Sequence, residues 1–317
     1  MRADGPVAYV DPAGLALLGA WAAHHRDRVG RSPEICDSLK NPYTYSTGLL
    51  GVLAGRESAG RPAAAGEWLP PRVVRSQEEI SSQIDELVPV LHLSPLGEPS
   101  RAVQYCLSET LRNVFEHSAS RIGAYVAAGH FQKSRRLTIA VADAGIGIPQ
   151  HIRNRVEAGW DDEAALIRAL EPEVTGSDDR DRNAGLGLFM MTHLARTFEG
   201  GVWILSGNAV ATLRADEDGP RAPLTPAKAG ARWQGTVVVI TLYLDRFGLL
   251  SVEETLHTIN QRMTGSYTPE ILPSFVRRGA DLPEGHLLVP IPKNANRLAE
   301  DKLEATRIRD QLLLPAL

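Results

Sequence analysis

The stretch SETLRNVFEHS, residues 108–118, decides the fold. On a helix, four of its polar residues fall on one face at i, i+4, i+7 and i+8: Glu109, Asn113, Glu116 and His117. A separate apolar stripe has similar spacing: Val103, Leu107, Leu111 and Val114. Such a helix packs through its apolar stripe and presents an acid, an amide and an imidazole to a polar site. A polar row alone is also typical of a solvent-exposed face.

A glycine-containing turn follows in VADAGIGIP, residues 141–149. Asp143 ends an expected strand over 137–143, and Gly145 and Gly147 follow it at a spacing of two. Glycine lets the backbone approach a ligand closely. A carboxylate at a strand end can accept hydrogen bonds from an exocyclic amine and a neighbouring water. By itself the pattern also fits an ordinary Asp-Ala-Gly turn.

A second glycine pair stands in NAGLGLFMM, residues 183–191, where Gly185 and Gly187 introduce an apolar helix expected over 186–198. The N-terminus of a helix presents free N–H groups and the positive end of the helix dipole, so phosphate is its natural ligand. The alternative is a tight loop whose glycines only permit packing of a helix on a sheet.

In this order and spacing, the three motifs resemble the GHKL superfamily of ATPases, which includes DNA gyrase, histidine kinases, MutL and the large heat-shock chaperones. A later strand begins with Gly235-Thr236, at the position where that superfamily places a threonine near adenine. The resemblance covers about residues 72–246. It implies the Bergerat fold, a two-layer α/β sandwich in which helices cover one face of a mixed sheet.

The resemblance also implies roles for single residues. Glu109 would be the general base that orients or deprotonates the attacking water, and Asn113 would coordinate Mg²⁺. His117 would contact phosphate or the Mg²⁺ shell, or would only orient Asn113. Asp143 would bind the adenine amino group. The other implied nucleotide contacts are Gly145, Gly147, Ile148, Gly185, Leu186, Gly187, Leu188 and Thr236. Residues 150–184 would be the lid that closes over the γ-phosphate.

The run SETLRNVFEH is most similar to the anti-sigma-factor serine kinases, since many histidine kinases carry Asn where this chain has Glu109. No phospho-acceptor helix precedes the site, which argues against an ordinary histidine kinase. We therefore expect an ATP-binding, Mg²⁺-dependent ATP-hydrolysing regulatory protein in signal transduction, with the lid as a conformational switch. Two alternatives stay open: a serine/threonine protein kinase of the anti-sigma type, and a nucleotide-dependent binding module that does not hydrolyse ATP.

Composition sets the background for these expectations. The 317-residue chain is 43% hydrophobic and 23% charged, which is typical of a globular protein, and its net charge of −4 favours neither nucleic acid nor a membrane surface. Two cysteines 70 positions apart, Cys36 and Cys106, predict neither a disulfide framework nor a metal cluster. We expect a cytoplasmic protein with a regulatory protein partner, and leave homodimerisation open.

The flanks predict further units. Residues 1–55 would form a small α/β unit, with strands at Val7–Val10 and Glu34–Cys36 and helices over 12–29 and 42–53. Its first strand-to-helix corner resembles STAS-like domains, but Asp11-Pro12-Ala13-Gly14 offers no hydroxyl for phosphorylation. Residues 56–71, rich in Gly, Ala and Pro, would be a linker. The ATP-binding domain would span 72–246, and 247–317 would be a mostly helical extension.

Overall fold

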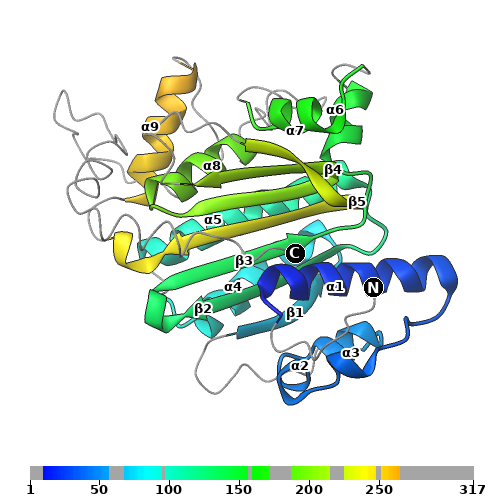
Figure 1. Cartoon of the computed structure of the whole chain (residues 1–317). Helices are drawn as coiled ribbons and strands as arrows, with labels where there is room; N and C mark the ends of the chain where they lie inside the picture. Colours follow the sequence, from blue (N-terminus) through cyan, green and yellow to red (C-terminus); the bar gives the residue numbers. More distant parts are fainter. Residues whose placement is uncertain are drawn as a thin grey trace.

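The computed structural model describes residues 10–56, 68–94, 97–155, 159–171, 187–214, 225–247 and 251–264. Its strands are β1 (Trp68–Val74), β2 (Ala124–Phe131), β3 (Arg136–Ala142), β4 (Gly201–Arg214) and β5 (Thr225–Tyr243). They form one sheet in the order β1-β2-β3-β5-β4 (Figure 1), and every pair is antiparallel. In this part of the chain the expectation of a mixed sheet is therefore wrong. The short turn Gln132–Arg135, with Arg135 at φ 52°, makes β2 and β3 a hairpin and needs no parallel crossover.

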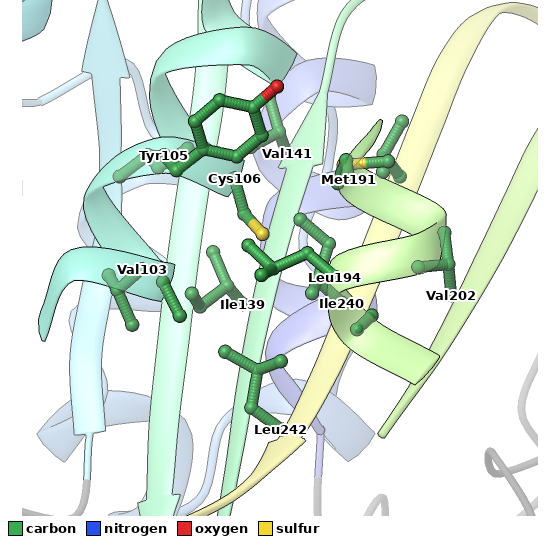
Figure 2. Packing of buried hydrophobic residues seen from close by; sticks show 14 of the residues in the cluster. Val103, Tyr105, Cys106, Ile139, Val141, Met191, Leu194, Val202, Ile240 and Leu242 are labelled. Atoms are coloured by element: carbon green, nitrogen blue, oxygen red, sulfur yellow. The ribbon is translucent and has the colours of Figure 1, made fainter. Parts of the chain in front are cut away.

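Helices cover one face of this sheet, as the α/β sandwich requires. They are α4 (Ile80–Val90), α5 (Glu98–Asn113), α8 (Gly187–Thr197) and α9 (Val252–Thr264). The core between them draws on alternate strand residues, as a period of two demands: Leu137, Ile139 and Val141 of β3 and Val238, Ile240 and Leu242 of β5. Figure 2 shows Cys106, Met191 and Leu194 among these side chains. Helix α5 is thus fixed in the core through the apolar stripe that the sequence predicts.

The intervening strand residues build a second core on the opposite face. Tyr125, Ala127, Ala140, Val237 and Val239 pack there against α1 (Pro12–Val29) and α3 (Leu49–Leu53). This second helical layer lies across the sheet in Figure 1 and was not expected from the sequence. It explains why the strands are apolar on both sides.

The N-terminal prediction needs correction. Helix α1 begins and ends where expected, with Asp11 accepting a hydrogen bond from Gly14 N at 2.8 Å and Gly30 in the left-handed region. The residues expected as a strand at 34–36 are not in one, and the described part of 1–55 contributes helices alone. The expected helix over 42–53 divides at Gly48, φ 72°, into α2 (Pro42–Ser46) and α3. Residues 10–55 therefore add a helical layer to the main sheet and form no α/β unit of their own.

The boundaries of other segments also differ from the expected ones. The sheet begins at Trp68, inside the expected linker 56–71. Strand β4 stays paired with β5 past an irregularity around Gly207. Helix α9 packs on the main core through Val252 and Leu256, so the start of the expected extension belongs to this domain. The rest of that extension, 265–317, lies outside the described residues, as do Val7–Ala8-Tyr9 and 57–67.

None of the described helices combines the length and the apolar composition that a bilayer crossing requires.

Candidate functional site

Asp143 lies immediately after β3 with its side chain buried, 2% exposed. Its Oδ1 accepts a hydrogen bond from Gly145 N at 2.7 Å. Burial raises the pKa of the carboxyl to about 7, although the N–H groups of Gly145 and Thr236 act in the opposite direction. Two backbone N–H groups thus act on this buried carboxyl, and Oδ2 is the oxygen that Gly145 does not occupy.

Thr236 on β5 stands beside Asp143, because its carbonyl accepts from Asp143 N at 2.9 Å. The Thr236 hydroxyl lies 3.0 Å from that of Ser206 on β4, and Ser206 Oγ also accepts from Ile148 N at 2.9 Å. Ser206 thus ties the predicted Thr236 to the predicted Ile148. No sequence motif marked this serine.

The two glycines of the turn have clear structural reasons. Gly147 has φ 77°, and a Cβ there would lie 2.9 Å from both Gln234 O and Ser206 Oγ. A Cβ on Gly145 would collide with the carbonyl of Ser118. That carbonyl accepts from Ile146 N at 2.8 Å, which joins the turn to the end of the helix that carries Asn113 and His117. Whether these glycines also approach a base remains a prediction.

That helix changes form at the site. Helix α5 passes at Asn113 into a π-helical turn, Val114–Ser118, and Ala119 at φ 53° ends it. Such turns concentrate at functional sites. This one places His117 one wide turn after Asn113 and brings Ser118 against the glycine-containing turn. Segments 30 residues apart thus meet at one end of α5.

Glu109 is buried, 7% exposed, in the last part of α5. Burial raises the pKa of its carboxyl, while Arg112 opposes the rise and Glu116 adds to it. Arg112 Nη1 donates to Glu109 Oε1 at 2.9 Å. A Cβ on Gly187, the first residue of α8, would collide with Glu109 Oε2. The acid therefore lies directly against the helix N-terminus at which we expect phosphate.

Asn113 fits a role in holding Mg²⁺. Its Nδ2 is a buried atom without a hydrogen-bond partner among the described residues, so the side-chain amide points into a site that those residues leave unsatisfied. Amide oxygen and nitrogen are interchangeable by a flip, and the oxygen is a ligand that Mg²⁺ prefers. The described residues contain no cluster of three or more His, Cys, Asp or Glu side chains suited to a metal. This agrees with an ion held by one protein group and by phosphate oxygens.

His117 faces a histidine that the sequence did not single out. Its ring lies 4.7 Å from that of His151, centroid to centroid. Burial lowers the pKa of both rings, that of His151 to about 4, with Arg155 and His117 adding to the effect on His151. His151 Nε2 is also buried without a partner among the described residues. Both rings are therefore neutral near pH 7, and each has one ring nitrogen that donates and one that accepts a hydrogen bond.

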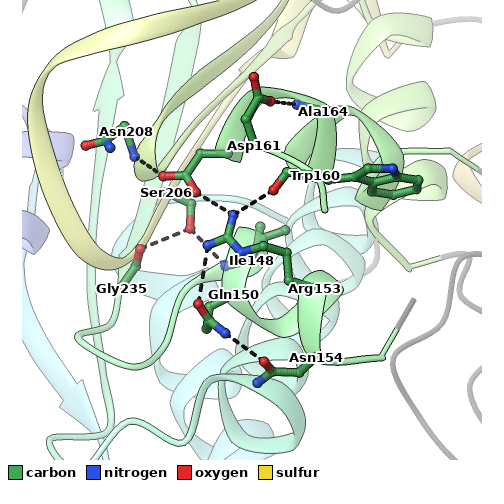
Figure 3. Close-up of polar contacts among 11 residues, drawn as sticks. Ile148, Gln150, Arg153, Asn154, Trp160, Asp161, Ala164, Ser206, Asn208 and Gly235 are labelled. Carbon is green, nitrogen blue, oxygen red and sulfur yellow. Dashed lines mark hydrogen bonds and ion pairs between the residues drawn. The ribbon is translucent and has the colours of Figure 1, made fainter. Parts of the chain in front are cut away.

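The first part of the predicted lid is firmly docked. It contains α6 (Ile148–Arg155) and α7 (Asp162–Ala169). Arg153 Nη1 bonds Asp162 Oδ1 at 2.7 Å, and Asp162 Oδ2 accepts from Asn208 N of β4 at 2.8 Å (Figure 3). Ile152, Ala165 and Ala169 form a small core of their own between the two helices. Residues 148–155 and 159–171 thus pack against each other and are tied to β4, and 172–184 lie outside the described residues.

Of the remaining predicted nucleotide contacts, one lies in the described part of the chain and two lie outside it. Leu188 packs against the main core, which gives it a structural role. Gly185 and Leu186 lie outside the described residues. The sequence missed Ser206, His151 and Arg112. Of these only Arg112 carried a signal, since it stands three residues after Glu109 on the same helix.

Comparison with known proteins agrees with this geometry. A search of curated proteins finds no match. The family described as histidine kinase-, DNA gyrase B- and HSP90-like ATPase matches residues 98–246, the range that contains α5, the glycine-containing turn, α8 and Thr236. The described structure is the α/β sandwich expected of that family, with a five-stranded antiparallel sheet. Residues 98–246 therefore form a domain of the histidine kinase-, DNA gyrase B- and HSP90-like ATPase type, which supports ATP binding.

Proposed function

We propose that this domain hydrolyses Mg²⁺-bound ATP, with Glu109 as the general base, and that the nucleotide state controls a regulatory protein partner. The observation that carries the proposal is the contact between Glu109 and Gly187. A buried carboxylate at the N-terminus of a helix lies where a terminal phosphate would bind, and so within reach of a water that attacks it.

The other residues have supporting roles. The Asp143 carboxylate accepts the adenine amino group, and Thr236 and Ser206 fix the backbone around it. Asn113 would hold Mg²⁺, which neutralises phosphate charge. The neutral rings of His117 and His151 can donate to phosphate oxygens without a change of protonation.

The segment that could move over the nucleotide is shorter than the lid that the sequence suggested. Because Arg153 and Asp162 anchor α6 and α7 to β4, closure over the nucleotide would not move these two helices as a unit. The remainder of the predicted lid, 172–184, stays a prediction.

The test compares Glu109→Gln with wild type. Glutamine keeps the size of the side chain but cannot take a proton from water, so Mg²⁺-ATP binding should persist while phosphate release falls by about 10²-fold or more. Glu253→Gln, which neutralises another buried glutamate that is paired with an arginine of α5, is the matched control and should release phosphate near the wild-type rate. An unchanged rate in Glu109→Gln would remove Glu109 as the base.

The same assay separates the two alternatives. With γ-labelled ATP, label in free phosphate supports hydrolysis. Label transferred to a STAS-like protein substrate supports the serine/threonine kinase, which the run SETLRNVFEH favours. Binding with neither product supports a nucleotide-dependent binding module.

A further inference from the structure

Arg112 is the charged neighbour of the proposed base. It follows Glu109 by three residues on α5, and its Nη1 bonds Glu109 Oε1 at 2.9 Å. The Glu109 side chain is 9% exposed and that of Arg112 is 27% exposed, so a buried anion is paired with a cation that reaches toward solvent. The second oxygen, Oε2, is the one that lies against Gly187.

We propose that Arg112 is a positioning residue for ATP hydrolysis: by holding Oε1 it directs Oε2 to the N-terminus of α8 and keeps the carboxylate ionised, ready to accept a proton from water. The inference rests on the function proposed above, in which Glu109 is the base. It adds a residue on which the strength of that base depends.

The charges around Glu109 support this role. Burial raises the pKa of Glu109, the Arg112 charge lowers it, Glu116 raises it, and the Arg112 hydrogen bond lowers it again. Tyr105 and Cys106 on the same helix also have raised pKa values because of burial, and both are neutral near pH 7.

From α8, Gly187 lies against the carboxylate and Met191 against Thr110, and neither side chain titrates. Arg112 is therefore the cation among these groups that offsets burial. Without it, a buried carboxyl would hold its own proton and lose its function as a base.

The same helix offers a matched control. Arg101 Nη1 bonds Glu253 Oε2 at 3.1 Å, and the Glu253 side chain is 4% exposed. This pair also joins an arginine of α5 to a buried glutamate, but it connects α5 to α9 and lies away from Glu109. Arg101→Gln therefore reproduces the loss of a buried ion pair without touching the proposed base.

The experiment measures ATP hydrolysis by steady-state phosphate release at varied Mg²⁺-ATP. The variants are Arg112→Gln, Arg112→Lys, Arg101→Gln, Glu109→Gln and the double variant Glu109→Gln with Arg112→Gln. At pH 7 we expect kcat of Arg112→Gln to fall about 10-fold or more, which corresponds to about one pKa unit or one charge-assisted hydrogen bond, at an unchanged KM for Mg²⁺-ATP. Arg112→Lys should restore most of the loss. The deficit of Arg112→Gln should shrink as pH rises, and Arg101→Gln should keep the wild-type pH profile.

The double variant decides whether Arg112 acts through Glu109. We expect it to hydrolyse no more slowly than Glu109→Gln alone. A further loss in the double variant, or a deficit of Arg112→Gln that is the same at every pH, would overturn the inference and leave the proposed function standing. A wild-type rate in Glu109→Gln would overturn both.

Discussion

The pKa of Asp143 makes the nucleotide preference of this domain depend on pH. Gly145 N occupies Oδ1, so a proton on the carboxyl goes to Oδ2, the oxygen left for the ligand. Ionised Oδ2 accepts from the amino group of adenine, whereas protonated Oδ2–H donates to the 6-oxo group of guanine. We predict that ATP is preferred over GTP at high pH and that this preference declines as pH falls.

The magnitude follows from the pKa of about 7. About ten elevenths of the free protein has Asp143 ionised at pH 8 and about one eleventh at pH 6, so ATP affinity should fall about 10-fold over this range. The affinity for GTP should rise over the same range. The measurement is the ratio of Kd for GTP to Kd for ATP at pH 6, 7 and 8, by calorimetry with saturating Mg²⁺. The ratio cancels titration of the phosphates and of His117 and His151, because both nucleotides share the triphosphate.

Asp143→Asn is the control. Its amide has no titration in this range and presents a donor to the adenine amino group, so ATP binding should be weak at every pH and the ratio should be flat. A wild-type ratio that stays constant from pH 6 to pH 8 would refute the assignment of Oδ2 to the 6-position of the base.

The free energy of unfolding should also depend on pH through Asp143, and the direction of this dependence follows from the raised pKa. The folded-state pKa of Asp143 is raised, so the unfolded chain ionises first and the free energy of unfolding falls as pH rises from about 4 to about 7. His151 acts in the opposite direction, because its pKa is lowered to about 4 and its contribution is lost as pH falls below its ordinary value. The difference between wild type and Asp143→Asn isolates the first effect.

Three further substitutions test the packing around the site. Gly187→Ala should lower kcat by about 10-fold or more because its methyl group collides with Glu109 Oε2, whereas Gly51→Ala, in open space on α3, should leave hydrolysis unchanged. Ser206→Ala removes the acceptor for Ile148 N and should lower the free energy of unfolding by about 1–3 kcal/mol in urea titrations, with exposed Ser46→Ala close to neutral. Leu15→Ala, at a fully buried position of α1, should cost about 2–5 kcal/mol in the same cooperative transition as the rest of the domain; a separate early transition would contradict the shared core.

The sequence predicted the site better than its surroundings, for a physical reason. Phosphate, metal and adenine recognition depend on a few residue types at fixed spacing. The candidate residues Glu109, Asn113, Asp143 and Gly187 could therefore be identified without a structure. Helix α1 was also predictable because Asp11-Pro12 and Gly30 mark both of its ends locally. What these signals predict is local geometry: the structure confirms the two ends of α1, and the roles of the site residues stay predictions.

Strand pairing and side-chain packing were harder to predict from the sequence. Residues 34–36 were expected to be a strand, but the local sequence does not show whether a strand of the sheet lies beside them. The pairing of β4 with β5 continues past Gly207, and a pairing partner so far along the chain leaves no local sequence signal. Arg112 and His151 escaped notice because their partners, Glu109 Oε1 and the His117 ring, are defined only by side-chain contacts.

The second helical layer bears directly on the adenine end of the site. Ala142 and Val237, which pack on the α1 side, immediately precede Asp143 and follow Thr236. Trp233 also packs on that side, and its Nε1 donates to Asp143 O at 2.8 Å. The backbone that orients the Asp143 carboxyl is therefore held by α1 on one face and by the core of α5 on the other. Because a recognition group is more precise when packing supports it, α1 would support the proposed nucleotide site from one layer away.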